Sequence, residues 1–152
     1  MINSRKIDDL KPEVAVLCRA FVQQCHLAGI EVLITSTYRD VEAQDAIYNQ
    51  GRTTPGRIIT NCKGGNSMHN YRVAFDWVPL DVKGAPVWND SHLWRECGQI
   101  AQDVGLEWGG AWANFVDMPH CQYTQGKSIA DLHAEYNLLA RENIIKNTSI
   151  GT

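Results

Sequence analysis

The chain has 152 residues, of which 44% are apolar and 20% are charged, and its formal net charge is −3. This size and apolar content predict one domain with its own core, so residues 1–152 are expected to form a single domain. The mild negative charge gives no general attraction to nucleic acid or to an anionic membrane, and neither is an expected partner.

Two further features bear on location and redox state. No apolar run approaches the ~18 residues that span a bilayer, and the polar segment 1–10 lacks the apolar core of a signal peptide. The cysteines are odd in number and form no CxxC pair, which predicts reduced, partly buried thiols rather than a disulfide framework or a cysteine zinc site. They are Cys18, Cys25, Cys62, Cys97 and Cys121.

The first elements have clear local signals. Apolar residues recur at three- and four-residue spacing over 12–28, with Pro12 suited to the first turn and Gly29 to the position after the helix, so a helix is expected there. The β-branched segment 30–35 predicts a buried strand, which ends just before Arg39.

A second helix is expected from Asp40, a suitable N-cap, to Gly51. Segment 51–68 has no helical periodicity and predicts a long functional loop, with a short strand at 58–60. The stretch from Gln50 to Arg72 contains basic residues and no acidic ones, which fits either an anionic substrate or a solvated basic loop; the basic residues are Arg52, Arg57, Lys63 and Arg72.

The second half of the chain alternates strands and helices. We expect a strand at 73–78, a helix from Ser91 to Gly105, short strands at 106–108 and 120–123, and a last amphipathic helix at 128–146. No internal repeat or linker divides these elements.

Two histidines stand in contexts rich in carboxylates: His69 precedes Asp76, and His120 follows Asp117. Two histidines and a carboxylate are a common ligand set for catalytic zinc. Seven residues would separate His69 and Asp76 by ~23 Å along a strand or ~10 Å along a helix, so the chain must turn at 70–72 for both to bind one ion. Spacing alone leaves packing or surface roles open, and no role is expected for His26, His92 or His133.

Pro119 disfavours helix at the residue before it, so Asp117 and His120 are expected on irregular or extended chain rather than on an HExxH helix. A zinc peptidase also needs a carboxylate that takes a proton from water, and Asp117 is the nearest unassigned candidate. Arg39, at a strand end, is a candidate for binding an oxyanion or a substrate carboxylate.

The tryptophans divide into two groups. Trp94 has helical spacing and is expected in the core. Trp108 and Trp112 flank a Gly-Gly loop near the proposed site, where core packing and a substrate groove are both open alternatives; we carry both as candidate substrate-binding residues.

The segment from Ser67 to Asp76 resembles the SxHxxGxAxD signature of the D-Ala-D-Ala carboxypeptidase-like metallopeptidases. The resemblance continues through other short motifs, and their order is most similar to the L-alanyl-D-glutamate peptidases used as phage endolysins and as some bacterial cell-wall hydrolases. These motifs are Ser36–Arg39, Gln50–Gly56, Lys63–Gly65, Trp108–Gly110, Trp112, Phe115 and Asp117–His120.

The resemblance implies a small α+β domain, with a central antiparallel sheet flanked by helices, of the hedgehog and D,D-peptidase type. It also implies zinc (Zn2+) held by His69, Asp76 and His120, with Asp117 as general base and Arg39 at the substrate or oxyanion. Ser67 is expected to face the substrate as well.

Two positions depart from the family pattern. Arg72 stands where the signature has glycine, and a left-handed conformation there would cost an arginine about 1 kcal/mol. Cys121 follows His120 where an aromatic residue is common. Cys121 is expected to pack without a chemical role, because adjacent residues of a strand point to opposite faces. Oxidation of its thiol, or binding of the metal by the thiol in competition with the other ligands, are the alternatives.

The expected function is that of a zinc endopeptidase cutting the L-Ala–D-Glu bond of the peptidoglycan stem peptide. As an endolysin without a signal peptide, it would wait in the host cytoplasm as a monomer, without stable membrane association, until it reaches the wall. Two alternatives remain: a D-Ala-D-Ala carboxypeptidase or dipeptidase on the same fold, and a non-catalytic zinc-containing wall-binding module.

Overall fold

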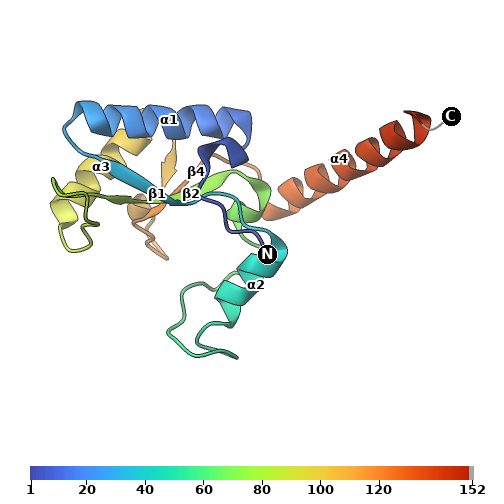
Figure 1. Ribbon diagram of the computed structural model, residues 1–152, viewed down its shortest axis with the longest axis horizontal. Helices are drawn as coiled ribbons and strands as arrows, with labels where there is room; N and C mark the ends of the chain where they lie inside the picture. The colour runs from blue at the N-terminus through green and yellow to red at the C-terminus, as the bar shows by residue number, and fades with distance from the viewer. Residues whose placement is uncertain (151–152) are drawn as a thin grey trace.

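The computed structural model describes residues 1–150, apart from the side chains of residue 145 and residues 147–150. The described residues form four α-helices and four strands, which alternate along the chain except that β3 and β4 follow one another (Figure 1). They are α1 (Pro12–Leu27), β1 (Val32–Ser36), α2 (Val41–Asn49), β2 (Ala74–Pro79), α3 (Ser91–Asp103), β3 (Glu107–Trp108), β4 (His120–Gln122) and α4 (Ile129–Ile150). Short 3-10 turns lie at η1 (Ile7–Asp9), η2 (Met68–Tyr71) and η3 (Gly109–Ala111).

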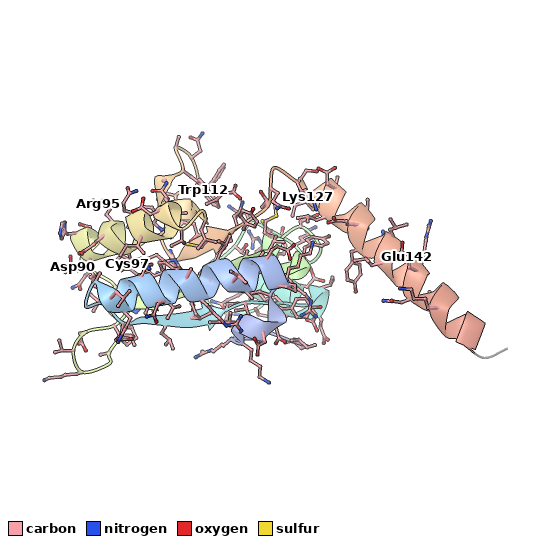
Figure 2. All side chains as sticks on the ribbon, turned by 90° about the horizontal axis from the view of Figure 1, so that it is seen from above. Asp90, Arg95, Cys97, Trp112, Lys127 and Glu142 are labelled. Atoms are coloured by element: carbon pink, nitrogen blue, oxygen red, sulfur yellow. The ribbon has the colours of Figure 1, made fainter. Side chains whose placement is uncertain are left out.

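The strands form one antiparallel sheet in the order β1-β2-β4-β3. The expected α+β fold with a central antiparallel sheet is therefore confirmed. Helices α1 and α3 lie side by side over one face of this sheet (Figure 2), whereas α2 lies on the opposite side (Figure 1). Different helices thus lie on the two sides of the sheet.

The strand β2 shows how the sequence separates the two faces. Phe75 and Trp77 are fully buried against Phe21 of α1, and the rings of Trp77 and Trp94 have centroids 4.7 Å apart. Trp94 is therefore a core residue, as predicted. Because side chains alternate along a strand, Asp76 points to the other face, which carries the candidate site.

Most expected elements are present, but two differ from the expectation. No strand forms at 58–60, because Ile58 and Ile59 are exposed and the loop is held by side chains instead: Arg52 Nη1 donates to the Thr60 carbonyl at 3.0 Å. The last helix exists, but beyond the buried Leu132 it runs away from the body (Figure 1). The large apolar side chains of Tyr136, Leu138, Leu139 and Ile144 are exposed along it.

All five cysteines are free, and Cys62 alone among them is exposed. The prediction that the thiols are partly buried is confirmed. Cys121 is completely buried on the core face of β4, opposite to the face of His120, so it packs as expected for adjacent residues of a strand. None of the helices within residues 1–150 combines the length and apolarity needed to cross a membrane.

Candidate metal centre

The turn η2 brings His69 and Asp76 together. Ser67 caps it: its Oγ accepts a hydrogen bond from the His69 N–H at 3.3 Å, and the Asn70 side chain accepts one from the Ser67 N–H at 3.2 Å. The turn ends at Arg72, whose backbone is left-handed with φ 63° and ψ 25°. The predicted reversal at 70–72 is therefore present, and β2 begins two residues later.

Arg72 stands where the family signature has glycine and adopts a left-handed conformation, and its own contacts offset the cost. Its Nη1 donates to the carbonyl of Asp9 at 2.8 Å, and its guanidinium lies 3.8 Å from the ring centroid of Tyr38. The Arg72 carbonyl accepts from the N–H of Lys11 at 3.0 Å. These bonds tie the turn to the start of α1.

Three side chains converge on the open face of the sheet, the face that α1 and α3 do not cover. His69 comes from η2, Asp76 from β2 and His120 from β4, where Asp76 and His120 are directly paired across the two strands. Their ligand atoms all lie within 4.8 Å of one another. Asp76 Oδ1 is 3.2 Å from His69 Nε2 and 3.3 Å from His120 Nδ1. One small ion fits among these donors.

Each histidine is also held through its second ring nitrogen. His69 Nδ1 is 2.8 Å from the carbonyl oxygen of Thr37, which only accepts hydrogen bonds, so Nδ1 carries the proton and Nε2 is left for a metal. His120 Nε2 is 2.8 Å from Oε1 of Gln122. Sequence reasoning missed both partners, although a polar residue two positions after His120 on a strand shares its face.

Arg39 lies beside the three candidate ligands and is mostly buried. Its Nη2 donates to Asp76 Oδ2 at 2.8 Å, its Nε to Ser36 Oγ at 3.0 Å and its Nη1 to Gln44 Oε1 at 3.2 Å. Gln44, which sequence reasoning also missed, is 1% exposed and donates in turn to the carbonyl of Cys62 at 2.9 Å. The guanidinium therefore has a fixed orientation at the site.

The charges of the site favour a carboxylate at Asp76. Burial opposes its ionisation, but the charges and hydrogen bonds of His69 and His120 outweigh burial and hold the pKa of Asp76 well below its usual value. Burial also opposes protonation of His120, yet the hydrogen bond and charge of Asp76 raise the pKa of that imidazole overall. A cation at this point is thus electrostatically favourable.

Asp117 lies on the loop between η3 and β4. Its N–H donates to the carbonyl of Gly109 at 3.0 Å, and its carbonyl accepts from the N–H of His120 at 3.2 Å. Loss of surrounding water raises the pKa of Asp117, and its carboxylate interacts with the charges of all three candidate ligands. The Asp117 carboxyl is therefore near enough to the three candidate ligands for their charges to affect its pKa, and it is not part of the group of converging ligand atoms.

The three candidate substrate-binding residues lie in different surroundings. Trp112 is half-buried, and its ring centroid is 5.4 Å from that of His120, so it borders the site. Ser67 is buried, and its Oγ serves the cap of η2. Trp108 is only 6% exposed and belongs to the core, where Nε1 donates to the Met118 carbonyl at 2.8 Å; of its two alternatives, the structure places it in packing beneath the loop.

Comparison with known proteins agrees with this geometry. A family model described as D-alanyl-D-alanine carboxypeptidase matches residues 60–123, which include the three candidate ligands. The chain is 38% identical over 122 residues to the peptidoglycan L-alanyl-D-glutamate endopeptidase CwlK of Bacillus subtilis, covering 75% of this chain and 73% of that protein. The chain belongs to the D-alanyl-D-alanine carboxypeptidase-like peptidase family.

Another relative and two solved structures extend the comparison. The L-alanyl-D-glutamate peptidase of Listeria phage A118 is 32% identical over 120 residues, which cover 77% of this chain and 39% of the phage protein. Among solved structures, the L-Ala D-Glu endopeptidase ChiX of Serratia marcescens has a TM-score of 0.59 at 18% identity, covering 78% of this chain and 83% of that one. The vancomycin resistance D,D-pentapeptidase VanY, solved with Zn(II), has a TM-score of 0.56 at 11% identity, covering 84% and 78%. These two structures share the fold.

Proposed function

We propose that this chain is a zinc-dependent peptidoglycan endopeptidase that cleaves the L-Ala–D-Glu bond of stem peptides. The observation that carries the proposal is the convergence of His69 Nε2, His120 Nδ1 and an Asp76 carboxylate oxygen within 4.8 Å, on a chain whose relatives are named for this cleavage. Two imidazoles and one carboxylate suit zinc and leave a fourth position for water or substrate.

The residues around this group have complementary tasks. Bound zinc would supply a Lewis acid that polarises the scissile carbonyl and makes water a better nucleophile. Asp117 takes the proton of the attacking water and returns it to the leaving amine, a task that favours a carboxyl whose pKa is raised. Arg39 fixes Asp76 and presents the rest of its guanidinium to the charge that develops on the carbonyl oxygen.

The substrate is proposed to lie along the open face of the sheet. Trp112, half-buried beside His120, offers an apolar wall to the stem peptide. Ser67 and Trp108 have supporting roles in this proposal. Ser67 stabilises the turn that carries His69, and Trp108 stabilises the loop that carries Asp117. We further propose that residues 1–152 form one peptidase domain, active as a monomer on the wall. The phage relative supports the role of an endolysin kept in the host cytoplasm until release.

The test is digestion of purified peptidoglycan, with and without a zinc chelator, followed by mass spectrometry of new amino termini. Chelator-sensitive D-Glu amino termini are expected. His120→Ala should lose both zinc and cleavage, whereas Asp117→Asn should keep zinc and lose cleavage. Released D-Ala would instead identify a D,D-carboxypeptidase, the activity named by the matched family model. Full activity in either variant, or no cleavage by zinc-loaded protein, would contradict the proposal.

A further inference from the structure

The two histidines of the metal centre are held in different ways. His69 Nδ1 faces a backbone carbonyl at 2.8 Å, and a carbonyl oxygen accepts but never donates a hydrogen bond. His120 Nε2 instead faces a side-chain amide, that of Gln122, at the same distance of 2.8 Å. The backbone therefore fixes the tautomer of His69, whereas the tautomer of His120 depends on a side chain that has both a donor and an acceptor end.

The position of Gln122 on β4 accounts for this contact. It lies two residues after His120, so both side chains project from the same face of the strand, and it is half-buried between Ala74 of β2 and Glu107 of β3. In the arrangement present in the structure, Oε1 of Gln122 accepts the proton of His120 Nε2. In the neutral ring, Nδ1 then carries a lone pair directed at the same space as His69 Nε2 and Asp76 Oδ1, whereas in the protonated ring Nδ1–H donates to Asp76 Oδ1.

The opposite arrangement is also self-consistent, and it would disable the site. If the amide of Gln122 turned over, its NH2 group would donate to His120 Nε2, and the ring would carry its proton on Nδ1. That proton would point at Asp76 Oδ1, 3.3 Å away, and would form a hydrogen bond there in place of a metal bond. A neutral imidazole binds metal only through its unprotonated nitrogen. Metal binding by His120 thus depends on which end of Gln122 faces it.

We propose that Gln122 is a positioning residue that selects the Nε2–H tautomer of His120 and thereby sets the affinity of the site for zinc. The proposal rests on the zinc site of the proposed function, but it concerns a residue that is neither a ligand nor a contact of the reacting atoms. The proposal makes a specific prediction. A glutamate carboxylate at this position can only accept a hydrogen bond from His120 Nε2, so it should preserve the tautomer. Methionine has a similar length but cannot replace the amide as a hydrogen-bond partner of the ring, so it should not preserve the tautomer.

The experiment compares Gln122→Met and Gln122→Glu with the unchanged protein. The zinc dissociation constant is measured by competition with a chromophoric chelator. The His120 tautomer is read in metal-free, 15N-labelled protein, at a pH high enough for the imidazole to be neutral, from long-range proton–nitrogen NMR spectra. Gln122→Met should weaken zinc binding about 10- to 100-fold, the usual effect of removing the hydrogen-bond partner of a ligand, and should lose the single Nε2–H pattern. Gln122→Glu should keep that pattern and bind zinc at least as tightly as the unchanged protein.

Gln125→Met is the matched control, since Gln125 is exposed and its amide donates to the Tyr123 hydroxyl at 3.2 Å rather than to a ligand. It should bind zinc normally. Excess zinc should restore wall cleavage by Gln122→Met, because the proposed role acts through affinity. If cleavage stays low at saturating zinc, Gln122 contacts the substrate instead and the proposal is overturned. Unchanged affinity and tautomer in Gln122→Met, or a loss in Gln122→Glu as large as in Gln122→Met, would overturn it as well.

These outcomes separate this inference from the proposed function. A protein that binds zinc with the expected dependence on Gln122 but cuts no peptidoglycan would contradict the proposed activity and leave the role of Gln122 standing. Conversely, wall cleavage that is lost with His120→Ala but indifferent to Gln122→Met, with zinc affinity unchanged, would leave the activity standing and refute the role of Gln122.

Discussion

Replacement of Arg72 tests how the turn between the first two ligands is stabilised. Its left-handed backbone, with φ 63°, costs a residue with a Cβ about 1–2 kcal/mol relative to the right-handed region. Against this stand a hydrogen bond to the Asp9 carbonyl, worth about 1 kcal/mol, and a cation–π contact with Tyr38, worth about 0.5–1 kcal/mol at an exposed position. The contacts and the strain are therefore of similar size.

Two substitutions separate these contributions. Arg72→Ala loses both contacts and keeps the strain, so it should be less stable than the unchanged protein by about 1.5–2 kcal/mol. Arg72→Gly loses the same contacts but also the strain. Part of that gain is offset by the greater freedom of glycine in the unfolded chain, which leaves Arg72→Gly about 0.5–1 kcal/mol more stable than Arg72→Ala.

Equilibrium unfolding of the metal-free protein in urea, followed by tryptophan fluorescence, measures this order. The unchanged protein should have the largest free energy of unfolding, Arg72→Gly the next largest and Arg72→Ala the smallest. An Arg72→Ala protein as stable as Arg72→Gly would refute the reasoning, because it would mean that the strain of the left-handed conformation is no larger than the offset from the greater freedom of glycine in the unfolded chain. Zinc affinity should change little in Arg72→Gly, since glycine adopts the same turn and still returns Asp76 to His69.

Three further predictions concern the support of the site. Gly98→Ala should destabilise the protein by about 1–3 kcal/mol in thermal unfolding, because its Cβ would lie 2.4 Å from ring atoms of Trp108, which holds the loop of Asp117. A thiol reagent should modify Cys62 alone in the folded protein and all five cysteines after unfolding; rapid native labelling of more than one would contradict the burial of the other four. Gln44→Met should lower kcat by releasing Arg39, and it should have no further effect in an Arg39→Ala background, whereas additive losses would show that Gln44 acts elsewhere.

Local signals were sufficient for the elements that carry their own caps and periodicity. The first helix, expected at 12–28, is found at Pro12–Leu27, with Gly29 in a left-handed conformation after it. Asp40 caps α2 as predicted, its carboxylate accepting from the Ala43 N–H at 2.8 Å. In these cases neighbouring residues alone determine the backbone, so no knowledge of distant contacts was needed.

The strand expected at 58–60 shows where local signals fail. Its β-branched residues suggest a strand, but no neighbouring strand offers a partner, and both isoleucines remain exposed. The loop is shaped instead by bonds from other segments, such as Gln50 Nε2 to the Arg57 carbonyl at 3.1 Å and Gln44 to the Cys62 carbonyl. Side-chain to backbone bonds of this kind depend on where α2 lies, which the loop sequence does not encode.

The metal centre depends on long-range structure even more strongly. Asp76 and His120 are 44 residues apart, and they meet because β2 and β4 pair in one register, with Phe75 opposite Cys121 on the core face. A slip of one residue would turn Asp76 into the core and Phe75 into the open face. Phe75 and Cys121 are completely buried against α1 and α3, so any such slip loses core packing. The residues that place the ligands are therefore the apolar ones between them, which is why a motif spacing could suggest the site but only the packed sheet determines its geometry.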